Sequence, residues 1–224
     1  MHTKPLSLLA VLVVACGISG AVTDAFATEP EPELLKASGE ALPTGAEIAV
    51  SSKAGTEPTF ILAPEGGIIC ESEHSLGGSP TSASTFSIRL DFVGCRLPHG
   101  GGDCHSAVTT GLIETYTLSF AIKRDFYYPG LVGLFGQNAE EGNKNLARLI
   151  CTTTEPPGKY EGYIQSCFFI GWNSPVNEST TQIEGIWEGN PSSECYDGYF
   201  DNVTTMLSVN YGGVKGIPIE LYRP

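Results

Sequence analysis

Imidazole, carboxylate and thiol side chains gather in one short segment, Cys95-Arg-Leu-Pro-His99-Gly-Gly-Gly-Asp103-Cys104-His105. These side-chain types bind zinc or copper, so His99, Asp103 and His105 form a candidate metal site. The spacing matches no zinc motif, because the chain contains neither C-x-x-C nor H-E-x-x-H. The alternative is structural: a glycine-rich hairpin tip closed by a disulfide.

A second candidate is the carboxylate pair Glu184 and Glu188, which flanks Trp187. Residues four apart in a strand share a face, so both carboxylates could line one groove, as acid–base glycoside hydrolysis requires. The alternative is two glutamates on the solvated face of a strand, in a chain with 25 acidic residues. No P-loop and no G-x-S-x-G elbow is present, and the sequence predicts no cofactor.

Aromatic side chains stand in turn-like contexts beside Gly, Pro, Asn or Asp. Exposed rings in such places can stack on sugars or contact a partner, and the alternative is that they cover the ends of the core. The candidate ligand-contact aromatics are Tyr127, Tyr128, Trp172, Tyr196 and Tyr199.

The N-terminal sequence predicts export. An apolar run from Leu6 to Val22 follows Lys4, and Ala25-Phe-Ala27 is an A-x-A cleavage site, so residues 1–27 are interpreted as a signal peptide. The preceding Val13-Val-Ala-Cys16 resembles a lipobox, which leaves lipid anchoring at Cys16 as an alternative. No other apolar stretch approaches the ~20 residues of a membrane-spanning helix.

Cleavage after Ala27 would remove one of the 7 cysteines, and the even number left in an exported chain indicates disulfides. A hairpin of 84–95 with 104–110 would set Cys95 opposite Cys104, and a turn around 156–159 would set Cys151 opposite Cys167. Elimination then joins Cys70 to Cys195. The predicted disulfides are therefore Cys95–Cys104, Cys151–Cys167 and Cys70–Cys195, one connectivity among those that six cysteines allow.

The remaining chain predicts an all-β fold with little helix. Residues 28–45 form an acidic, proline-rich segment expected to be a flexible lead-in, and 46–224 is expected to be a single domain. Short runs rich in β-branched and aromatic residues alternate with turn residues, which favours an antiparallel β-sandwich or barrel-like domain stapled by disulfides. The clearest strand is 112–123, with Tyr116 on its apolar face and Glu114 as an exception there.

The charge of the chain limits its partners. The formal net charge is −13 and Lys123-Arg124 is the only basic doublet, so neither nucleic acid nor an anionic membrane surface is an expected partner. A polysaccharide or a protein of the cell surface is the expected partner class.

Three features match a known group of proteins: an Ile-rich strand ending at Cys70, the sequence Phe92-Val-Gly-Cys95, and a further cysteine at Cys104. In these features the chain resembles uncharacterised exported proteins of soil actinobacteria. The resemblance implies secretion and an all-β fold, and it carries no activity or site residue.

These observations favour a secreted or cell-envelope β-domain that binds a surface ligand and is not an enzyme. Two alternatives stay open. One is an extracellular hydrolase, such as a glycosidase, using Glu184 and Glu188. The other is a purely structural envelope protein.

Overall fold

The fold is described from a computed structural model. The model describes residues 30–56, 59–62, 66–98, 101–106, 109–124, 132–140, 143, 145–154, 157–165, 168–172, 176–187, 199–200 and 203–223. These residues form β-strands and no helix. None of them belongs to a helix long and apolar enough to cross a membrane.

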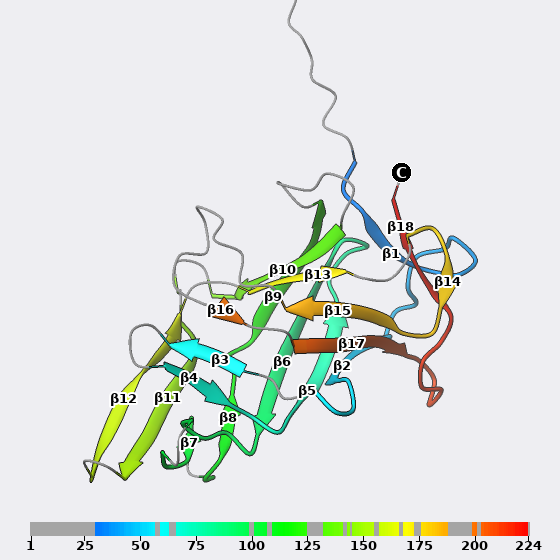
Figure 1. The fold of residues 1–224 in the computed structure, drawn as a ribbon. Helices are drawn as coiled ribbons and strands as arrows, with labels where there is room; N and C mark the ends of the chain where they lie inside the picture. The colour runs from blue at the N-terminus through cyan, green and yellow to red at the C-terminus, as the bar shows by residue number, and fades with distance from the viewer. Residues whose placement is uncertain are drawn as a thin grey trace, which may run out of the picture.

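The largest sheet has nine strands. They are β2 (Glu47–Ser52), β5 (Ser72–Pro80), β6 (Thr85–Val93), β8 (Leu112–Glu114), β9 (Leu118–Arg124), β10 (Val132–Asn138), β13 (Phe168–Trp172), β15 (Ile183–Trp187) and β17 (Val203–Asn210). Neighbours follow the order β5-β2-β17-β15-β13-β10-β9-β6-β8, and β6 also pairs with β5. All its pairings are antiparallel, and the pairing of β5 with β6 closes the curled sheet (Figure 1). The predicted all-β, antiparallel, barrel-like fold is confirmed.

Alternating apolar side chains fill the inside of this curled sheet. The even-numbered residues of β6 are buried, for example, and so are residues 118, 120 and 122 of β9. Phe86 and Phe120 stack there with ring centroids 5.4 Å apart. Gly136 makes room for them, because a Cβ at that position would lie 2.3 Å from a Phe120 ring atom. Close packing of this kind fixes which face of each strand points inward.

A second layer contains β3 (Thr59–Leu62), β4 (Gly66–Ile69), β7 (Cys104–His105), β11 (Asn145–Thr154), β12 (Pro157–Gln165) and β16 (Tyr199–Phe200). The orders β16-β3-β4 and β7-β11-β12 are joined through bridges of Arg96 to Ile69 and to Asp103. Several chain segments connect the layers, and two of them follow β4 and β6. The second turns at Gly94, whose φ of 69° suits glycine and whose Cβ would meet Glu71 at 2.6 Å.

A third, small sheet has the order β1-β18-β14. Its strands are β1 (Glu33–Lys36), β18 (Ile219–Tyr222) and β14 (Ser179–Thr180). Strand β1 lies inside the range predicted to be a flexible lead-in, so that prediction is wrong for these residues. The reason is that Leu34 and Leu35 are buried, and their burial against β18 outweighs the surrounding glutamates and prolines.

The predicted strand 112–123 is interrupted. Thr115 is buried, and its hydroxyl accepts a hydrogen bond from the Leu90 amide at 2.9 Å, in place of a backbone ladder bond. The interruption shifts the alternation, so Glu114 lies outward while Ile113 and Leu118 lie inward. This explains the exception at Glu114. The prediction that Tyr116 lies on an apolar face is wrong, because its side chain is exposed.

Candidate functional site

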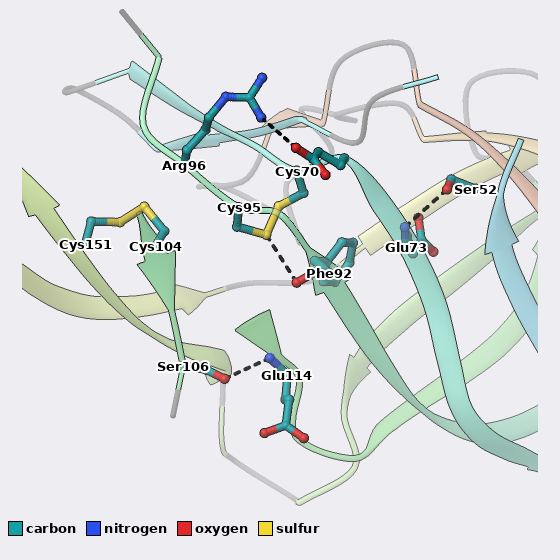
Figure 2. Close-up of a disulfide and its surroundings, with 11 residues drawn as sticks. Ser52, Cys70, Glu73, Phe92, Cys95, Arg96, Cys104, Ser106, Glu114 and Cys151 are labelled. Carbon is teal, nitrogen blue, oxygen red and sulfur yellow. Dashed lines mark hydrogen bonds and ion pairs between the residues drawn. A yellow bond between two sulfur atoms is a disulfide. The ribbon is translucent and has the colours of Figure 1, made fainter. Parts of the chain in front are cut away.

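Four cysteines lie in a row across four neighbouring chain segments. Cys70 bonds to Cys95 and Cys104 bonds to Cys151, and all four side chains are fully buried. The Cys104 amide donates to the Cys95 carbonyl at 2.8 Å, so the two disulfides are neighbours, side by side in Figure 2. The segment 95–105, which the sequence offers as a candidate metal site, therefore contributes one cysteine to each of two adjacent disulfides.

The predicted Cys95–Cys104 disulfide is wrong, although these two residues do lie opposite each other. The Cys104 amide donates to the Cys95 carbonyl, and Cα atoms at such hydrogen-bonded positions stand about 5.5 Å apart. Cys70–Cys95 and Cys104–Cys151 form non-hydrogen-bonded pairs, with Cα separations of 4.0 and 4.1 Å. Side chains approach more closely in the latter type, which brings the sulfur atoms together.

The other two predicted disulfides are also wrong. Cys151–Cys167 fails because Cys151 is bonded to Cys104, and Cys70–Cys195 fails because Cys70 is bonded to Cys95. The first prediction assumed that Cys151 pairs within its own hairpin. The second joined the two cysteines that the other pairings left unassigned. Cys167 and Cys195 lie outside the described residues.

The candidate metal ligands are only partly described. His99 lies outside the described residues, Asp103 is exposed, and His105 lies opposite Ile150 on the face of β7 that points away from the disulfides. Within the described part of the chain, no three His, Cys, Asp or Glu side chains are placed to hold a metal ion.

Only one member of the candidate carboxylate pair lies in the described part of the chain. Glu184 forms an ion pair with Lys53 at 3.0 Å, and Glu188 lies outside the described residues. Among the candidate aromatics, Trp172 is the last residue of β13 and Tyr199 the first of β16. The other three candidates, Tyr127, Tyr128 and Tyr196, lie outside the described residues.

Polar side chains meet instead on the outer face of the curled sheet. Ser51 of β2 pairs with His74 of β5, His74 with Asp91 of β6, and Asp91 with Glu114 of β8. Directly opposed residues of neighbouring strands point to the same face. These four residues, with Arg89 two positions before Asp91, are called the polar row below.

Asp91 is the unusual member of the polar row. It is only 6% exposed, and its Oδ1 atom is buried without a hydrogen-bond partner among the described residues. Burial, followed by the negative charge of Glu114, raises the pKa of Asp91, while His74 and Arg89 oppose the shift. A buried acid with a raised pKa beside a second carboxylate is a common property of functional sites.

The rest of the polar row is accessible. Arg89 lies 3.8 Å from the Glu114 carboxylate and donates to the carbonyl of Thr115 at 3.4 Å. The Glu114 amide donates to the Ser106 hydroxyl at 2.8 Å, which fixes β8 in place (Figure 2). Arg89 also lines an open pocket of about 410 Å³ between β2, β5 and β6. No sequence pattern predicts this site. Glu114, which breaks the apolar alternation of the strand predicted at 112–123, is the one residue of the polar row that stands out in the sequence.

A further buried acid lies inside the curled sheet. Glu73 is 1% exposed; its carboxylate accepts a hydrogen bond from the Thr205 hydroxyl at 3.2 Å, and its amide donates to Ser52 (Figure 2). These bonds link β5 to β17 and β2, so Glu73 has a structural role inside the sheet.

The fold and the polar row define an all-β protein, built on a closed antiparallel sheet and braced by two adjacent disulfides, with an acidic site on its outer face. No protein-family model, no curated protein and no solved structure matches the chain.

Proposed function

We propose that the protein is exported, to the extracellular space or the cell surface, and binds a surface polysaccharide or protein through the polar row, without converting it. Asp91 carries the proposal, because a buried carboxyl oxygen with no hydrogen-bond partner among the described residues lowers stability and is expected to be retained for another reason. The two disulfides support export, since such bonds persist in oxidising compartments.

Replacing Glu114 with Gln is expected to weaken ligand binding about tenfold, because a charged contact at an accessible site is lost. Glu184→Gln is a matched control: the side chains are 32% and 33% exposed, and each carboxylate is ion-paired with one basic residue. Binding would be measured on arrays of cell-wall polysaccharides and surface proteins, then by calorimetry on each hit. The absence of any ligand at millimolar concentration, or equal losses in both variants, would contradict the proposal.

Hydrolysis by Asp91 and Glu114 is the second candidate function. The raised pKa of Asp91 favours a carboxylic acid that can donate a proton to a glycosidic oxygen, beside a carboxylate held by Arg89. Release of nitrophenol from a panel of aryl glycosides would test it. Hydrolysis that disappears in Asp91→Asn and in Glu114→Gln, but persists in Glu184→Gln, would favour this function over binding alone.

A further inference from the structure

A second surface lies on the outward face of the hairpin of β11 and β12, which extends away from the curled sheet (Figure 1). Tyr163 lies directly opposite Arg148, and Glu161 lies two residues earlier on the same side of β12. Tyr116 is attached beside them, since its amide donates to the Leu146 carbonyl of β11 at 2.8 Å. Tyr116, Arg148, Lys159, Glu161 and Tyr163 are called the tyrosine face below.

The two tyrosine rings are accessible. Tyr116 is 42% and Tyr163 47% exposed. Both phenols lie close enough to Arg148 to contribute to its raised pKa, which arises mainly from its hydrogen bond with Glu161. Strand register places Tyr163 beside Arg148, and Tyr116 is bonded to β11 two residues before Arg148. Tyrosine gives a large contact area at low entropic cost, and it is enriched at binding sites for that reason.

The charged groups of the tyrosine face are held in place. Arg148 donates to the Glu161 carboxylate, and Lys159 lies 3.3 Å from the same group. The hydrogen bond from Arg148, followed by that from Lys159, lowers the pKa of Glu161. Two cations thus share one carboxylate, which leaves the tyrosine face locally positive on a chain with a net charge of −13.

We infer that the tyrosine face binds an acidic saccharide chain, one that carries carboxylates such as those of uronic acids. Sugar rings offer C–H groups that pack on exposed tyrosines, and their carboxylates complement the excess positive charge of Arg148 and Lys159. The tyrosine face is a second binding surface, separate from the polar row, and the inference rests only on the proposed export of the protein to a place where such saccharides occur.

The test uses the mature full-length chain with hexagalacturonate, and cellohexaose as the uncharged comparison. Tyr116→Ala and Tyr163→Ala are each expected to weaken hexagalacturonate binding about tenfold. Tyr211→Ala and Tyr222→Ala are matched controls, because these tyrosines are 45% and 39% exposed elsewhere on the molecule. Lys159→Gln is expected to weaken binding and its salt dependence, and Lys215→Gln is expected to change neither.

Three results would overturn the inference: no binding of hexagalacturonate at millimolar concentration, equal losses in the control tyrosine variants, or equal affinity for cellohexaose. If a variant loses its fold, as judged by thermal unfolding, ring-proton shifts of Tyr116 and Tyr163 in the wild-type protein on adding hexagalacturonate decide the question. If hexagalacturonate binding is lost in Glu114→Gln and unchanged in Tyr116→Ala and Tyr163→Ala, this inference is overturned and the proposed function remains.

Discussion

Removing the Cys104–Cys151 disulfide by the double replacement Cys104→Ala, Cys151→Ala is expected to lower the free energy of unfolding by about 4 kcal/mol. The bond closes a loop over 47 positions of sequence, so its loss releases a large ensemble of unfolded conformations. This is a large share of the 5–15 kcal/mol typical of a domain. Urea unfolding followed by tryptophan fluorescence measures the change.

Cys70→Ala, Cys95→Ala provides the comparison. This disulfide spans 25 positions, so its loss is expected to cost about 0.6 kcal/mol less. The two loops do not overlap in sequence, so each disulfide constrains a separate part of the unfolded chain. Peptide mapping of the unreduced protein should yield the same two linkages. A linked Cys95–Cys104 peptide, or a loss below 1 kcal/mol in both double variants, would contradict the assignment.

Asp91→Asn is expected to stabilise the protein at pH 7 by about 1–3 kcal/mol, because it removes a buried charge whose Oδ1 atom has no hydrogen-bond partner in the described part of the chain. The folded-state pKa of Asp91 lies above its ordinary value of 3.8. As the pH rises from 3.8, the unfolded chain therefore loses this proton before the folded chain does, and stability falls until the folded-state pKa is passed. At lower pH both states are protonated, and the advantage of the variant disappears.

Unfolding midpoints in urea between pH 3 and pH 8 test this dependence. Glu184→Gln again serves as the control, since its carboxylate is paired with Lys53 and more exposed. A pH-independent difference between wild type and Asp91→Asn would show that the charge of Asp91 is not the cause. A less stable variant at pH 7 would show that the carboxylate has a favourable partner in solution.

The sheet architecture could be predicted because alternation along a strand reports which face is buried. The strand predicted at 84–95 matches β6 closely for this reason. Strand β1 could not be found this way, since Leu34 and Leu35 are adjacent and both buried, between charged residues. Its position depends on β18, at the other end of the chain.

The functional surfaces were harder to predict, because they combine residues that are distant in sequence. The polar row joins Ser51, His74, Asp91 and Glu114 through strand register, which no local pattern contains. The disulfides show the same limit more sharply. The register of Cys95 with Cys104 was predicted correctly, but whether a pair is hydrogen-bonded depends on the neighbouring strands.

The order of the four cysteines also has a consequence for how the chain is oxidised. Cys95 is nearer in sequence to Cys104 than to its native partner Cys70, so an intact reduced chain encounters the wrong partner most easily. A chain that enters an oxidising compartment from its N-terminus presents Cys70 and Cys95 before Cys104. Directional entry therefore favours native pairing, and we expect oxidation during synthesis and export to yield more native protein than refolding of the complete chain.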